Sequence, residues 1–200
     1  MPKLIQEQFG EVMLEAMREF ARKDLGDPAG YELTYFNHVG DGALRTTLAE
    51  TMYGARWIYK LGLALLVRDA EQLAHVRAQI LDYSSVCEGL LSDMVRHAIV
   101  SHHVVGAKHL VNSRGQAINW ASGITAKLTK QTFFWFIEVA EEEAIISPGL
   151  ATRLQTLRKE RNTIHLRSRT YNAYLGASRS AFGVLTDTIQ ATRDWRNAHP

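Results

Sequence analysis

The 200-residue sequence is poor in cysteine, in proline and in long apolar runs. A single cysteine, Cys87, excludes an internal disulfide framework and is typical of a reducing compartment. The longest apolar run, residues 61–67, is far shorter than the roughly 18 residues that a membrane span needs. Residues 1–9 show no apolar secretion signal. We therefore expect a cytoplasmic protein with no membrane partner.

The sequence also lacks the common signatures of cofactor and nucleophile sites. Gly40-Asp41-Gly42 has neither the lysine nor the strand–turn–helix context of a phosphate loop, and there is no nucleophile elbow. Cys87 lies in an apolar helical stripe, which indicates an unreactive core thiol. Four histidines lie close together without the spacing of a zinc site, so we expect them to face the surface or a partner. They are His97, His102, His103 and His109. No metal and no cofactor is expected.

Long stretches without proline or glycine favour helices. Apolar residues recur every three or four positions, and alternation with period two is nearly absent. The predicted fold is an all-α, antiparallel helical bundle of about five to seven helices. A short extended piece is expected at residues 31–36. The helices are expected at residues 5–21, 48–67, 70–101, 131–144 and 171–197, with one more beginning at Ser147-Pro148.

Two of these helices have a clear expected orientation. The helix of residues 70–101 carries small side chains beside its apolar stripe, which let another helix or a second copy of the chain come close. These are Ser84, Ser85 and Gly89. In the helix of residues 131–144, one set of residues is expected to point inward and four glutamates outward. The inward set is Phe134, Ile137 and Ala140, and the glutamates are Glu138, Glu141, Glu142 and Glu143.

Positive charge is concentrated in the last quarter of the chain. Residues 151–200 hold nine basic and three acidic residues, which gives +6 against −4 for the rest. Eight of the nine are arginines, and this favours phosphate recognition over a merely solvated lysine-rich face. An exposed polar face with ordinary arginines is the alternative.

The chemically densest stretch runs from Leu157 to Leu166, at the end of a helical pattern. The spacing of Arg158, Arg161 and His165 places them on one face of a helix, with Asn162 at its margin. A guanidinium matches phosphate oxygens, imidazole transfers protons near neutral pH, and an amide can orient either group. The pattern predicts phosphodiester chemistry. In the alternative, His165 caps a helix end and the arginines pair with Glu160 or with acidic residues at 138–143.

The run from Leu157 to His165 resembles the signature of HEPN domains, helical proteins found in toxin–antitoxin, abortive-infection and CRISPR-associated RNases. Residues 134–146, the helix start at Ser147-Pro148 and the segment 83–91 also look like parts of that family. The resemblance covers roughly residues 70–195 and leaves the first 65 unexplained. The chain is therefore divided into a helical N-terminal extension packed on the bundle, residues 1–65, and a HEPN-like bundle, residues 66–200.

The family pattern is an arginine, four to six residues and a histidine, often with a polar residue after the arginine. Arg158 has six residues between it and His165, whereas Arg161-Asn162 has three. The expected working set is Arg161, Asn162 and His165, with Arg158 assisting. Some members carry a tyrosine two residues after the histidine as a target of AMP transfer; this chain has Arg167 there, which argues against that regulation.

The resemblance implies a metal-independent endoribonuclease, with roles in stress, toxin–antitoxin systems or phage defence. The expected partners are RNA, a second copy of the chain, and an antitoxin or regulatory protein. The RNA-binding residues expected besides the working set are Arg153, Lys159, Arg167 and Arg169. Two other hypotheses stay open: a catalytically silent HEPN-like module that binds RNA, a nucleotide or a protein, and a helical interaction protein in which the motif is only a capped helix end.

Overall fold

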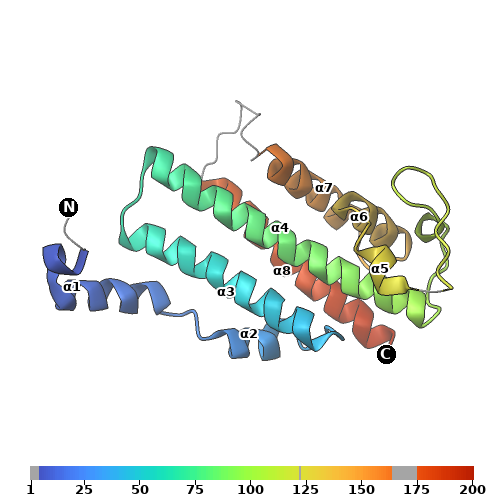
Figure 1. Cartoon of the computed structure of the whole chain (residues 1–200), viewed down its shortest axis with the longest axis horizontal. Coiled ribbons are helices and arrows are strands. Elements are labelled where there is room, and N and C mark those ends of the chain that lie inside the picture. Colours follow the sequence, from blue (N-terminus) through green and yellow to red (C-terminus); the bar gives the residue numbers. More distant parts are fainter. Residues whose placement is uncertain (1–4, 122, 164–174) are drawn as a thin grey trace.

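The computed structural model describes residues 5–121, 123–163 and 175–200, and within these ranges the protein is all-helical (Figure 1). Eight α-helices and one short 3-10 helix, Lys108–Leu110, are present there, with no strand. The α-helices are α1 (Ile5–Arg22), α2 (Pro28–Tyr35), α3 (Gly42–Ala64), α4 (Asp69–Val100), α5 (Ile124–Leu128), α6 (Phe133–Glu142), α7 (Pro148–Thr163) and α8 (Leu175–Ala198). The predicted all-α class is confirmed, although the helices are more numerous than expected.

The extended piece expected at residues 31–36 is wrong, because α2 occupies this segment. The Asp27 carboxylate caps the helix by accepting the Gly30 N–H at 2.7 Å, and Pro28 stands in its first turn. Tyr31 then reaches the core. The local capping signal therefore outweighs the β-branched and aromatic composition that suggested an extended chain.

Helix α3 also begins earlier than expected, at Gly42 rather than near Leu48. The Asp41 side chain accepts the Leu44 N–H at 3.1 Å and caps the first turn. The start of α7 is as predicted, since the Ser147 hydroxyl accepts the Leu150 N–H at 3.3 Å directly before Pro148.

Helix α4 lies at the centre of the fold, with α3 on one side (Figure 1). The two run antiparallel, so Gly89 of α4 lies opposite Leu48 of α3. A Cβ at position 89 would come within 2.8 Å of the Leu48 side chain. The small residue expected to admit another helix therefore admits one from the same chain.

Helix α8 packs along α4 in the same direction, whereas α3 runs in the opposite direction. Near the start of both helices, the Ser178 hydroxyl donates to the Gln79 side chain. Near their ends, the His97 ring hydrogen-bonds to the His199 carbonyl, 2.9 Å away. The bundle is thus antiparallel only in part.

One hydrophobic core joins the helices α2, α3, α4, α6, α7 and α8. Residues on both sides of position 65 contribute to it, and the division of the chain there stays a prediction. Cys87 lies fully inside this core, and burial raises the pKa of its thiol to about 12. No helix in the described ranges is both long enough and apolar enough to cross a membrane.

Two orientations expected in α6 are wrong. Phe134 is 41% exposed instead of inward, whereas Ile137 and Ala140 are buried as expected. Glu143 is buried instead of outward, because its carboxylate accepts two backbone N–H groups from the loop after α4. These are the N–H groups of Val105, at 2.7 Å, and Gly106, at 3.0 Å. Glu143 therefore binds that loop to α6.

Candidate functional site

A hollow of about 520 Å³ lies where the end of α7 passes α4 and the start of α6. Its walls come from four segments that are far apart in sequence: α4, the loop after it, α6 and α7. The lining residues are Glu88, Ser113, Thr132, Phe133, Phe134, Arg158, Arg161 and Asn162. Arg161 and Asn162 of the predicted working set, and the assisting Arg158, therefore meet in one cavity.

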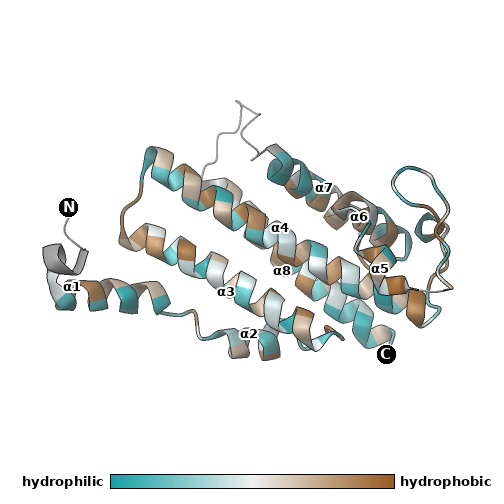
Figure 2. Cartoon of the chain, in the orientation of Figure 1, coloured by the Kyte–Doolittle hydropathy of each residue, from teal (hydrophilic) through white to brown (hydrophobic). Residues whose placement is uncertain are grey.

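Helix α7 places these residues at the cavity because the helix face that is buried along most of its length carries basic residues at its C-terminal end. Leu150, Leu154 and Leu157 pack in the core, and Arg161 lies one turn further along the same face. Arg158 and Asn162 lie on the flank beside it, toward the cavity. Figure 2 shows that the ribbon of α7 becomes hydrophilic toward its end. The helix thus passes from the core to a polar hollow.

Arg161 forms an ion pair with Glu88 of α4. Its Nη1 atom lies 2.5 Å from the Glu88 Oε2 atom, and the side chains are 31% and 28% exposed. A charged hydrogen bond in such a half-buried place is shorter and stronger than one between neutral groups. The pair holds the guanidinium at the wall of the cavity.

Arg158 is held by a neutral partner and by an aromatic ring. Its Nε donates to the Gln155 Oε1 atom at 2.8 Å, and its guanidinium carbon lies 5.3 Å from the centre of the Phe134 ring. Gln155 in turn donates to Glu138 at 3.2 Å. Gln155 therefore links Arg158 to the acidic side of α6, whereas Arg161 pairs with α4.

The exposure of Phe134 follows from the start of α6. Thr132 caps the helix by accepting the Trp135 N–H at 3.3 Å. Four aromatic residues follow in a row, Phe133 to Phe136, and a helix turns by about 100° per residue, so one of the four must point away from the core. Phe133, Trp135 and Phe136 are buried, which leaves Phe134 beside the cavity. The length of this aromatic run is the signal that sequence reasoning missed.

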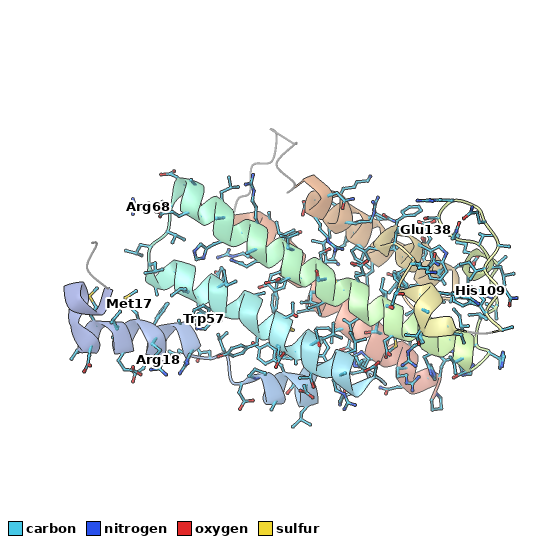
Figure 3. The ribbon with its side chains drawn as sticks, in the orientation of Figure 1. Met17, Arg18, Trp57, Arg68, His109 and Glu138 are labelled. Atoms are coloured by element: carbon cyan, nitrogen blue, oxygen red, sulfur yellow. The ribbon has the colours of Figure 1, made fainter. Side chains whose placement is uncertain are left out.

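The loop after α4 brings Ser113 to the cavity. The Asn112 side chain accepts the N–H groups of Arg114, at 2.9 Å, and Gln116, at 3.0 Å, and so forms a turn. The Trp135 indole donates to the Val111 carbonyl at 2.6 Å, which fastens this turn to α6. Figure 3 shows Glu138 and the loop residue His109 at this end of the molecule.

The predicted RNA-binding residues are not all brought together. Arg153 lies on the opposite flank of α7, paired with Asp187 of α8 at 2.5 Å. Lys159 is exposed and does not line the cavity. His165, Arg167 and Arg169 lie outside the described residues. The cavity therefore holds Arg158, Arg161 and Asn162 of the predicted site.

Of the clustered histidines, His102 and His103 are exposed as expected. His109 is buried under the loop after α4 instead of facing the surface. His97 and His103 gather with His199 around Trp195, whose ring stacks on His199 at 4.4 Å between centroids. Within the described ranges, no three His, Cys, Asp or Glu side chains are placed to hold a metal ion.

No protein-family model matches this chain, and neither a curated protein nor a solved structure matches it. The cavity and the motif at the end of α7 are therefore the features of this chain that bear on its function.

Proposed function

We propose that this protein is a metal-independent endoribonuclease with a HEPN-like helical bundle. The observation that carries the proposal is the meeting of Arg158, Arg161 and Asn162 in one cavity of about 520 Å³. Pockets of roughly 300–1,000 Å³ are typical of small-molecule sites, so a nucleotide unit fits this volume. Two guanidinium groups at one wall match the charge of a phosphodiester.

The reaction is a transesterification at phosphorus. The ribose 2′-oxygen attacks the adjacent phosphorus, its proton passes to a base, and the bond to the 5′-oxygen breaks as that oxygen takes up a proton. The products are a 2′,3′-cyclic phosphate and a 5′-hydroxyl. We assign the proton transfer to His165, as base for the 2′-hydroxyl or acid for the leaving oxygen. Arg161, with Arg158, stabilises the charge on the phosphorane-like transition state, and Asn162 orients these groups.

We further propose that two copies of the chain work together, each contributing one motif to a shared cleft. The basic C-terminal quarter, +6 in residues 151–200, favours association with RNA. We propose that Arg153 and Lys159 of α7, together with Arg167 and Arg169, also bind RNA. Such an RNase suits a stress, toxin–antitoxin or phage-defence role under an antitoxin or regulatory protein.

One observation favours a second candidate function, a catalytically silent module that binds RNA, a nucleotide or a protein. Arg161 already has a carboxylate partner, Glu88, at 2.5 Å. A phosphate that approaches Arg161 meets the negative charge of Glu88 at the same wall. This arrangement permits binding through Arg158 while it weakens stabilisation of a transition state by Arg161.

The test is cleavage of single-stranded RNA in EDTA by the wild type and by Arg161→Ala and His165→Ala. Loss of one donor to a developing charge typically lowers a rate by about 10²–10³-fold, and we expect that loss for Arg161→Ala. Arg18→Ala is the control, because Arg18 of α1 is an ion-paired arginine outside the cavity with no proposed role in RNA binding.

The nuclease is supported if the wild type and the control cleave RNA to 2′,3′-cyclic phosphate ends and the two variants have no activity. A wild type that binds RNA without cleaving it supports the silent module. Full cleavage by Arg161→Ala and His165→Ala contradicts the assignment of these residues. If no RNA binds at physiological salt and His165→Ala is functionally neutral, the motif is only a capped helix end.

A further inference from the structure

Phe134 is an aromatic ring left exposed beside two cations. It is 41% exposed although its three aromatic neighbours in sequence are buried. The Arg158 guanidinium lies 5.3 Å from the ring centre, and Arg161 lines the same cavity. Burying an apolar ring of this size stabilises a protein by roughly 1.5–3 kcal/mol, and this ring forgoes much of that gain. An exposed aromatic side chain in a charged hollow is typical of a ligand platform.

We propose that the cavity is a subsite for one unpaired nucleobase, which stacks on Phe134 while the phosphate of the same nucleotide binds Arg158 and Arg161. This proposal depends on the proposed function for the choice of RNA as ligand. It adds the substrate class: single-stranded RNA with a base turned out of its stack. Proteins that bind single strands combine these two elements, a flat aromatic surface and a cationic track for the backbone.

The rest of the cavity wall suits a base better than an aliphatic side chain. Ser113, Thr132 and Asn162 place two hydroxyl groups and one amide around the ring, and these groups donate and accept hydrogen bonds as base edges do. The ionised groups are Arg158, Arg161 and Glu88, which give the cavity a net charge of +1. An anionic ligand with a flat face fits both the charge and the ring.

The subsite predicts that paired RNA is a poor ligand. In an A-form duplex each base is stacked on its neighbours, so its face cannot reach a protein ring. A single strand, a loop or an end exposes such a face at little cost. We therefore expect the protein to prefer single strands to duplexes of the same length and charge.

The experiment measures binding of the full chain to fluorescent RNA by anisotropy, with a 2′-deoxy cleavage site to prevent turnover. The probes are a single strand, its duplex, and the same strand with abasic nucleotides, which keeps the phosphates and removes the stacking faces. Phe134→Leu keeps an apolar side chain and removes the aromatic face. Phe134→Trp restores an aromatic face and tests whether stacking itself is required.

Phe20 supplies a matched control. It is a phenylalanine exposed to 43%, and the Lys60 ammonium lies 5.5 Å from its ring centre, but it belongs to α1, outside the cavity. Stacking of one base on an aromatic ring contributes enough affinity that its loss costs about 5- to 100-fold. We expect Phe134→Leu to weaken single-strand binding about tenfold, Phe20→Leu to leave it unchanged, and Phe134→Trp to restore it.

We also expect abasic RNA to bind the wild type about as weakly as intact RNA binds Phe134→Leu. Abasic RNA should bind Phe134→Leu no more weakly than it binds the wild type, because both changes remove the same stacking contact. The subsite is overturned if Phe134→Leu binds RNA as tightly as the wild type, or if Phe20→Leu loses as much affinity as Phe134→Leu. It is also overturned if abasic RNA binds the wild type as tightly as intact RNA does. A wild type that binds no RNA in low salt overturns it as well.

A cleavage assay on all-ribose RNA separates this proposal from the proposed function. Wild-type cleavage with no effect of Phe134→Leu on binding or rate means that the nuclease stands and the subsite fails. Binding that depends on Phe134 without any wild-type cleavage means that the subsite stands and the nuclease fails.

Discussion

Arg161 at the end of α7 donates to Glu88 in the middle of α4, with 2.5 Å between Nη1 and Oε2. The two residues are 73 positions apart in the chain, and both line the cavity of about 520 Å³. The carboxylate positions the guanidinium and also competes with any phosphate for it. The competition between the Glu88 carboxylate and a phosphate for Arg161 can be tested by substitution of Glu88.

Glu88→Gln is expected to tighten RNA binding several-fold. The change removes one negative charge from the cavity wall and keeps the shape of the side chain, so Arg161 is more available to phosphate. The measurement is RNA affinity at about 50 mM and 200 mM salt, where the gain shrinks as salt screens the charge. Glu15→Gln, which removes the partner of Arg18 in α1 outside the cavity, is the control. Equal gains in the two variants, or weaker binding by Glu88→Gln, contradict the competition.

Gly89→Ala is expected to lower the free energy of unfolding by about 1–2 kcal/mol. Its Cβ would come within 2.8 Å of Leu48, whose side chain is fixed in the core, so α3 and α4 must move apart. Gly54 in the interior of α3 has nothing within 4 Å of such a Cβ, and Gly54→Ala is expected to stabilise the protein by up to about 1 kcal/mol. Urea unfolding measures the change in the free energy of unfolding for both variants. A change of the same sign in the two would refute the close contact between α3 and α4.

Glu143→Gln is expected to destabilise the protein by about 2 kcal/mol, because its buried carboxylate accepts the N–H groups of Val105 and Gly106. The amide presents a donor where the carboxylate accepts, so one backbone N–H loses its partner. Thermal unfolding measures the loss, and hydrogen exchange is expected to increase at these two amides. Glu141→Gln on the same helix is the control, and an equal loss there would contradict a specific anchor.

The stability of the protein is expected to fall between about pH 6.5 and pH 4 because of His38. Burial, followed by the nearby Arg193 charge, lowers the pKa of His38 to about 4. Thr192 donates its hydroxyl proton to the Thr188 carbonyl at 2.8 Å, so it accepts from the His38 Nε2–H at 3.0 Å, and this bond sets the tautomer of the neutral ring. Unfolded chains bind the proton near the ordinary pKa of 6.5, so the folded state is penalised as the pH falls through this window.

His38→Gln is expected to remove roughly 2–3 kcal/mol of this pH dependence, as measured by urea unfolding at pH 7, 5.5 and 4.5. His102→Gln is the control, since His102 is exposed. A pH dependence that is unchanged in His38→Gln would show that other groups cause it.

Local signals in the sequence predicted much of the helical structure. The apolar period gave α4 and α8 within a few residues, and the Ser147-Pro148 pair marked the start of α7. Two predicted side-chain orientations were wrong, those of Phe134 and Glu143. Phe134 was assigned to the core, although it belongs to a row of four aromatics of which only the other three are buried. Glu143 was assigned to solvent because its partners belong to a loop that sequence periodicity does not describe.

The candidate site, too, was predicted only in part from the sequence. The motif in α7 predicted Arg158, Arg161 and Asn162 as neighbours, because helix geometry sets the spacing of residues three and four apart. Glu88, Phe134 and Ser113 come from other segments, and their approach depends on how α4, α6 and the loop pack. Local interactions act over a few residues, so they specify the helices and their polar ends. The cavity depends on contacts between distant residues, and only the tertiary structure brings those together.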